Sequence, residues 1–234
     1  MKMTMMQHFS ELRRRILWTL LVFVLAFCFG WVISPTVELF ITRPLLNVWN
    51  DAALLYTGLS DGLMIQFSLA TLVAMIITIP VLMWHVWAYV APGLHKNEKN
   101  FLLPIFLFSP ILFLMGAAFA FYILFPIVFK FFIDISISEN LPVVLFPSIK
   151  GYLAFAIGLL KVFGVAFQLP LVLVLMNMAG VLSRKTAEHS RKYVIVCIFI
   201  AAAVLTPPDI VSQILLAIPM WLLFEISLLF MRRD

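Results

Sequence analysis

The chain has 234 residues, of which 64% are apolar and only 12% are charged, and its mean hydropathy is strongly positive. A water-soluble domain carries about a quarter charged residues, so this composition excludes a water-soluble fold. One crossing of a hydrocarbon layer about 30 Å thick takes about 20 apolar residues. Six crossings and short loops would therefore use the whole chain, residues 1–234, as a single polytopic membrane domain.

Six apolar runs predict transmembrane helices at residues 16–34, 66–90, 101–133, 151–181, 193–205 and 210–231. The first run begins like a signal peptide, but it is long and lacks a small-x-small cleavage site, so we expect it to remain as the first span. The fifth run has about 13 residues, or near 20 Å of helix. The sixth reaches Glu225 after only 15 residues. The fifth and sixth helices are thus short for a normal bilayer.

The basic residues indicate the orientation of the chain. Twelve of the sixteen lie on the side of the N-terminus, whereas Arg43, Lys130 and Lys150 lie on the other side and Lys161 falls inside a span. The twelve are Lys2, Arg13, Arg14, Arg15, Lys96, Lys99, Arg184, Lys185, Arg191, Lys192, Arg232 and Arg233. Because basic residues favour cytoplasmic loops, both termini are expected in the cytoplasm.

Two longer external loops, residues 35–65 and 134–150, mix apolar and polar residues and are expected to form a cap. Ser34 before Pro35 predicts an N-cap and first-turn pair, followed by a segment on the membrane surface. Prolines also lie inside the apolar runs, and each should bend its helix, so we expect a curved bundle with a concave side. They are Pro80, Pro104, Pro110, Pro126, Pro170 and Pro219. No internal repeat is evident, which weakens an inverted-repeat transporter interpretation.

Two carboxylates on the predicted cytoplasmic side have ordinary explanations when each is considered alone. Glu11 lies four residues before Arg15 on an amphipathic segment, and an ion pair with Arg15 or Arg14 would add a few tenths of a kcal/mol. Glu98 lies among basic residues, where a surface salt bridge is worth at most about 1 kcal/mol. Tyr89 falls at the depth where aromatic rings prefer the membrane interface.

Polar groups inside the predicted spans are few. Lys161 and Gln168 are seven residues apart and therefore share one face of a continuous helix. An ionisable group near the middle of a membrane needs water or a partner, so a wet cavity is expected, with snorkelling or an internal hydrogen bond as the alternative. Glu225 lies nearer the cytoplasm, where Arg232 is a possible partner. Residues 206–209 form a tight external turn, in which Thr206 caps and Pro207 begins the next helix.

Nothing in the sequence predicts catalysis, a cofactor or a metal site. The four histidines have no ligand spacing, and no nucleophile has an evident base. Cys28 and Cys197 both lie in apolar runs, where they are expected to act as small buried hydrophobes. The chain is therefore not expected to be an enzyme.

Four blocks of sequence together resemble the TatC family, the core subunit of the twin-arginine protein translocase. They are residues 8–15, residues 86–94 with Glu98, residues 163–170, and residues 205–209 with Gln213 and residues 217–220. The resemblance implies a receptor in a bacterial-type cytoplasmic (inner) membrane that binds signal peptides with consecutive arginines. It also implies assembly with single-span TatA- and TatB-type subunits, self-association in a larger complex and export of folded proteins driven by the proton-motive force. No nucleic-acid partner is implied.

The resemblance also implies roles for individual residues. The twin arginines of the signal are met by Glu98 and Glu11 with Tyr89 beside them, and Arg13 and Leu94 are assigned to the same site. Paired carboxylates suit this ligand, because a guanidinium is always charged and binds carboxylates through two bonds. Many members have a glutamate where this chain has Gln168, so we expect that position to supply polarity and not titration. Partner docking falls to the short fifth span with Thr206, Pro207, Pro208, Asp209, Gln213 and Glu225.

Two other functions remain open from the residues alone. One is a secondary transporter or channel that moves a small solute along the face of Lys161 and Gln168. Solute uptake by the purified protein alone would favour it. The other is a structural scaffold for a larger complex, which predicts tolerance of substitutions at both Glu11 and Glu98.

Overall fold

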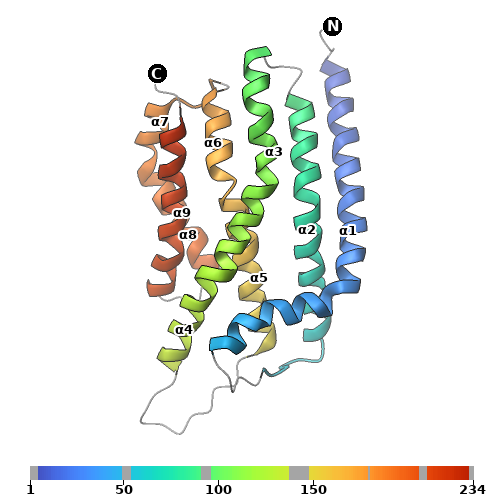
Figure 1. The fold of residues 1–234 in the computed structure, drawn as a ribbon, viewed down its shortest axis with the longest axis vertical. Coiled ribbons are helices and arrows are strands. Elements are labelled where there is room, and N and C mark those ends of the chain that lie inside the picture. The colour runs from blue at the N-terminus through green and yellow to red at the C-terminus, as the bar shows by residue number, and fades with distance from the viewer. Residues whose placement is uncertain are drawn as a thin grey trace.

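The computed structural model describes residues 5–48, 54–90, 96–136, 148–178, 180–205 and 210–231. Apart from short connections and one isolated bridge between Leu55 and Ser148, these residues are helical (Figure 1). The helices are α1 (Met5–Val48), α2 (Asp61–Val90), α3 (Lys96–Phe119), the π-helix η2 (Ala120–Leu124), α4 (Phe125–Ser136), α5 (Ile149–Ala166), α6 (Leu169–Met178), α7 (Arg184–His189), α8 (Arg191–Leu205) and α9 (Ile210–Phe230).

Within the described residues, five helical stretches are long and apolar enough to cross a membrane. They are Ser10–Leu46, Asp61–Tyr89, Leu107–Asp134, Ile149–Met178 and Ile210–Phe230. The predicted fifth span corresponds to α8, which has 15 residues and is therefore about 22 Å long. The predicted short fifth helix is thus present, whereas the prediction that the sixth is also short is wrong, because α9 continues through Glu225 and has 21 residues. A sixth crossing and the orientation of the chain stay predictions.

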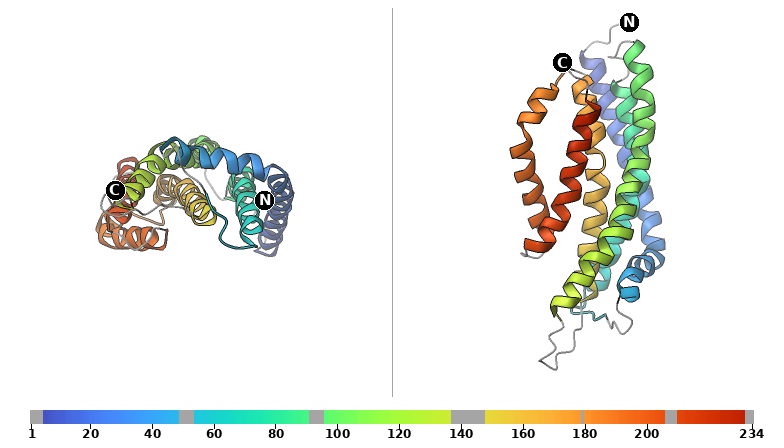
Figure 2. Two further views of the ribbon diagram at one scale, coloured as in Figure 1. Left: turned by 90° about the horizontal axis from the view of Figure 1, so that it is seen from below. Right: turned by 60° about the vertical axis from the view of Figure 1, so that its left-hand side comes forward.

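The helices form a curved layer. Helix α1 packs along α2, α2 contacts α3, α3 lies against α5, and α9 contacts both α6 and α8. Viewed along the bundle, the layer runs from α1 and α2 to α8 and α9 and leaves a concave side (Figure 2). The two ends of the described chain lie at the same end of the bundle, on opposite sides of it, and we call this the termini end (Figure 1). The opposite end is the far end.

Helix α1 bends so that its shorter C-terminal part lies across the far end of the bundle (Figure 1). Pro35 has no N–H and leaves the carbonyl of Trp31, four residues earlier, without its helical donor. The Ser34 hydroxyl donates to that carbonyl at 2.8 Å. The predicted N-cap role of Ser34 is therefore wrong, because its hydroxyl acts as a donor inside a continuous helix. The part of α1 that lies across the far end is held to α5 by the Tyr152 hydroxyl, which donates to the Ile41 carbonyl at 2.7 Å.

Two of the predicted proline bends coincide with interruptions of the regular α-helix. Pro126 is the second residue of α4 and follows the π-helix η2, in which the Phe125 N–H donates to the Ala120 carbonyl. Pro170 is the second residue of α6 and follows a turn at Phe167 and Gln168. Pro170 lies in the first turn of α6, where a missing N–H is not needed, whereas Pro126 adjoins a π-helical turn, a distortion that accompanies kinks in continuous helices. The predicted span at 151–181 is thus two helices, α5 and α6.

Loop residues at the far end are tied together around Asp61, the first residue of α2. Its carboxylate is buried, forms an ion pair with Lys150 at 2.9 Å and accepts from the Gly58 N–H at 2.7 Å. The Ile149 N–H donates to the Leu55 carbonyl at 3.1 Å. These contacts join the two predicted external loops, although residues 49–53 and 137–147 of them lie outside the described residues.

Candidate functional site

The carboxylate of Glu11 lies on α1 at the termini end and is held by Arg15 one turn further along. Arg15 donates to Glu11 Oε1 from Nε at 3.1 Å and also from Nη2. The Arg15 Nη2 donates in addition to the Ala88 carbonyl on α2 at 3.3 Å. The predicted pairing of Glu11 with Arg15 is therefore confirmed, and it also links α1 to the end of α2.

The second oxygen of this carboxylate is the unusual feature. Glu11 Oε2 is buried and has no hydrogen-bond partner within the described residues, although the side chain as a whole is 23% exposed. A buried carboxylate oxygen without a donor is unfavourable by about 1–3 kcal/mol. Such an atom is a candidate acceptor for a cationic ligand.

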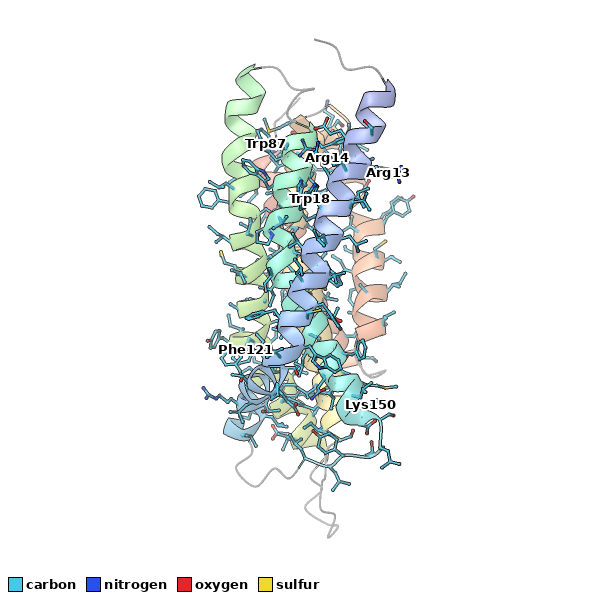
Figure 3. The ribbon with its side chains drawn as sticks, turned by 90° about the vertical axis from the view of Figure 1, so that its right-hand side faces the viewer. Arg13, Arg14, Trp18, Trp87, Phe121 and Lys150 are labelled. Atoms are coloured by element: carbon cyan, nitrogen blue, oxygen red, sulfur yellow. The ribbon has the colours of Figure 1, made fainter. Side chains whose placement is uncertain are left out.

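Glu11 lines a pocket of about 390 Å³. Its lining includes Arg14 and Trp18 from α1 and His85 from α2. Figure 3 shows Arg13, Arg14 and Trp18 at the termini end of α1, with Trp87 on the neighbouring α2. The pocket thus combines one carboxylate with cationic and aromatic walls.

A second pocket, of about 340 Å³, continues deeper between α1 and α2. It is mostly apolar, but Arg15, Thr78, His85 and Tyr89 also line it. Thr78 Oγ1 and His85 Nδ1 are buried and have no hydrogen-bond partner in the described part of the chain. Arg15 and His85 line both pockets, so they mark the boundary between them.

The structure brings together only some of the residues predicted for signal-peptide binding. Arg15 donates to Glu11 and lines the deeper pocket together with Tyr89, so Glu11 and Tyr89 are both neighbours of Arg15. The side chain of Arg13, in contrast, is exposed and makes no hydrogen bond or ion pair with any described residue. Glu98 is in the first turn of α3, but its side chain lies outside the described residues, and so does the whole of Leu94.

His85 and Ala88 were missed by sequence reasoning. His85 lies four residues before Tyr89, hence on the same face of α2, and this spacing was visible in the sequence. The Ala88 carbonyl carried no such signal, because a backbone acceptor depends on how α1 packs against α2.

The predicted intramembrane polar pair is arranged differently from the expectation. Gln168 is 9% exposed and exchanges two hydrogen bonds with Ser109 of α3. The Ser109 hydroxyl donates to Gln168 Oε1 at 2.7 Å, and Gln168 Nε2 donates to the Ser109 carbonyl at 2.7 Å. The expectation that Lys161 and Gln168 share a face assumed an unbroken helix, but α5 ends at Ala166 between them. The wet cavity stays a prediction.

The residues predicted for partner docking connect α8 with α9. Gln213 Nε2 donates to the Phe199 carbonyl at 2.9 Å. Glu225 forms a two-bond ion pair with Arg191, at 2.8 Å from Nε and 3.1 Å from Nη2. Its described partner is thus Arg191 and not the expected Arg232, which lies outside the described residues. Thr206, Pro207, Pro208 and Asp209 also lie outside them.

Among the described residues, no group of His, Cys, Asp and Glu is close enough together to hold a metal ion. The side chains at the termini end offer charge and hydrogen bonding. A single carboxylate with an unused oxygen can accept a guanidinium or an ammonium, and the aromatic ring of Trp18 can contact its flat face.

Comparison with known proteins gives a consistent result over nearly the whole chain. The family model described as Sec-independent protein translocase protein (TatC) matches residues 7–219. The chain is 36% identical to the Sec-independent protein translocase protein TatC of Magnetococcus marinus over 99% of its length and 84% of that protein. It is 38% identical to the TatC of Haemophilus influenzae over 96% of its length and 87% of that protein. It is 34% identical to the TatC of Escherichia coli strain K12 over 96% of its length and 86% of that protein.

The fold is similar as well. A crystal structure titled Twin Arginine Translocase Receptor TatC superposes with a TM-score of 0.86 at 31% identity and covers 95% of this chain and 97% of its own. A second crystal structure of that receptor, in the detergent DDM, gives a TM-score of 0.88 at 31% identity, with 96% and 99% covered. The chain therefore belongs to the TatC family of multi-pass membrane proteins, the Sec-independent twin-arginine protein translocase subunits.

Proposed function

We propose that the chain is the receptor of a twin-arginine translocase, and that Glu11 and Glu98 bind the two arginines of the signal peptide. The observation that supports this most directly is the buried, unpaired Oε2 atom of Glu11 in a pocket at the termini end. The similar crystal structures are those of a twin-arginine translocase receptor, which agrees with the proposal.

The chemistry favours arginine over lysine. A guanidinium presents a planar fork of N–H donors that can bond both oxygens of a carboxylate, whereas an ammonium acts as a point charge. Two adjacent guanidinium groups matched to two carboxylates would therefore discriminate an Arg-Arg signal from a Lys-Lys signal. Tyr89, which lines the adjoining pocket, would contact the peptide beside the arginines.

Glu98 is assigned to the site by the family resemblance and by its place in the chain. It is in the first turn of α3, which follows the end of α2 after residues 91–95. Negative side chains are favoured near a helix N-terminus, so the position suits a carboxylate. Arg13 and Leu94 belong to the same proposed site.

The proposed placement is a bacterial-type cytoplasmic membrane with both termini, and hence the site, on the cytoplasmic side. The excess of basic residues on that side supports this orientation. The short α8 and its contacts with α9 through Gln213 and Glu225 support a docking surface there for single-span TatA- and TatB-type subunits. A helix too short for the bilayer can recruit neighbours at modest cost. Residues 206–209 belong to the same proposed surface.

The alternative of a small-solute transporter or channel is not favoured. Its proposed path used the polar face of Lys161 and Gln168, but both hydrogen-bonding ends of the Gln168 amide are bonded to Ser109. The family is one of protein translocase subunits.

Direct binding tests the receptor proposal. A fluorescent Arg-Arg signal peptide would be titrated against the purified chain in lipid nanodiscs, with Glu11→Ala, Glu98→Ala and the double variant compared. A hydrogen-bonded charged group contributes about 1.5–3 kcal/mol, so each single substitution should weaken binding by about tenfold or more. Glu38→Ala is the matched control, because Glu38 lies in the second half of α1, away from the site. Unchanged binding by the double variant would refute the assignment.

A further inference from the structure

We propose that Arg15 occupies Glu11 as an internal stand-in for one arginine of the signal peptide, so that binding is an exchange of guanidinium groups. The inference rests on the proposed receptor function and concerns how its site is regulated. It assigns a specificity-determining role to a residue that otherwise looks like an ordinary partner within one helix.

The geometry of the pair shows that Arg15 satisfies the carboxylate only in part. Its Nε and Nη2 atoms both donate to Oε1, while Oε2 is buried without a partner in the described part of the chain. The favourable arrangement of a guanidinium and a carboxylate is two parallel bonds, one to each oxygen. An arginine arriving from outside α1, free of the geometry of an i, i+4 pair, can use both oxygens.

A displaced Arg15 has other acceptors within reach. Its Nη2 already donates to the Ala88 carbonyl at 3.3 Å. It also lines the deeper pocket of about 340 Å³ between α1 and α2, which His85 lines as well. The buried Nδ1 of His85 has no hydrogen-bond partner in the described residues. Arg15 can therefore leave Glu11 without becoming an unpaired buried cation.

This exchange would change both the affinity of the site and its selectivity among cationic ligands. The internal pair lowers the affinity for every cationic ligand, because each ligand must first replace Arg15. A ligand that forms two parallel bonds recovers that loss, whereas an ammonium, which bonds as a point charge, recovers less. Arg15 would thus lower the affinity for an Arg-Arg signal slightly and raise the discrimination against a Lys-Lys signal.

The test is that removal of Arg15 should raise the affinity for the signal peptide and not lower it. In the nanodisc titration, Arg15→Gln is expected to bind the Arg-Arg peptide about two- to fivefold more tightly, which is the range for a partly exposed i, i+4 ion pair. The ratio of affinities for Arg-Arg and Lys-Lys peptides should fall in the same variant. Arg14→Gln is the matched control, because Arg14 lines the same pocket and carries the same charge but makes no bond to Glu11.

The outcomes separate this inference from the proposed function. An equal gain in Arg14→Gln and Arg15→Gln would mean simple charge repulsion, and weaker or unchanged binding in Arg15→Gln would mean that Arg15 is not a stand-in. Either result overturns the inference. Failure of the unsubstituted chain to bind the Arg-Arg peptide would instead overturn the receptor proposal.

The folding of each variant must be checked as a control, because Arg15 also links α1 to α2. Size-exclusion profiles and melting curves would accompany each titration. If Arg15→Gln does not fold, Arg15→Lys is used, which keeps the charge but loses the fork, and it should bind the Arg-Arg peptide about twofold more tightly. If neither variant folds, or if Arg15→Lys binds no better than the unsubstituted chain, Arg15 is a structural anchor and the inference is wrong.

Discussion

The pair of hydrogen bonds between Ser109 and Gln168 predicts a measurable coupling between α3 and the α5–α6 turn. Both residues are buried, with exposed fractions of 0% and 9%, and both bonds measure 2.7 Å. We expect Gln168→Leu to lower the free energy of unfolding because it removes both bonds and leaves the Ser109 hydroxyl without its partner.

The magnitude follows from the individual bonds. Hydrogen bonds between membrane helices contribute about 0.6 kcal/mol on average and up to about 1.7 kcal/mol. Gln168→Leu should therefore destabilise by about 1–3 kcal/mol. Ser109→Ala removes only the bond to Gln168 Oε1 and keeps the bond to its own carbonyl, so it should destabilise by about 1 kcal/mol.

A double-mutant cycle isolates the interaction. The single variants and Ser109→Ala/Gln168→Leu would be unfolded in detergent by a denaturing surfactant, and the free energies compared. The double variant is expected to lose about 1 kcal/mol less than the sum of the single losses, because one bond is counted in both. Losses that add within about 0.3 kcal/mol would refute the interaction.

Three further results are expected. Gly116→Ala should lower the melting temperature clearly, because a Cβ there would overlap the backbone carbonyl of Phe163, whereas Gly151→Ala, where a Cβ meets only ordinary contacts, should leave it unchanged or raise it; equal melting curves would contradict this. Asp61→Ala should lower the melting temperature more than Lys150→Ala, because it removes the acceptor of the Thr57 and Gly58 N–H groups as well as the ion pair; the reverse order would be evidence against this explanation. Glu225→Ala removes the ion pair between α8 and α9 and should reduce co-purification of a single-span subunit, and full recovery of that subunit would exclude the proposed surface.

The sequence predicts the helices well because each of the six apolar runs, including the short run at 193–205, is mostly helical within the described residues. It underestimates α1, since the apolar run at 16–34 marks only the crossing and the helix continues through Pro35 to Val48. Hydropathy does not show this continuation, which depends on how the Ser34 hydroxyl replaces the donor that Pro35 lacks.

Local pairing is predictable and distant pairing is not. The Glu11 and Arg15 pair follows from i, i+4 spacing. Sequence reasoning had no means of finding the contact between Ser109 and Gln168, because the residues are 59 positions apart and meet only once α3 packs against the end of α5. The choice of Arg191 as the partner of Glu225 likewise depends on the packing of α8 against α9.

The central claim is that this chain recognises an Arg-Arg signal at the carboxylates of the termini end. Its most direct test is photocrosslinking in native membranes, with a crosslinking amino acid placed at Leu12 or at Asn97, next to Glu11 and Glu98, or at the exposed Leu59 near the start of α2. We expect an Arg-Arg signal peptide to be captured at the first two positions but not at Leu59, and a Lys-Lys peptide to be captured at none. Equal capture of both peptides at Leu12 and Asn97, or capture at Leu59 alone, would contradict the account.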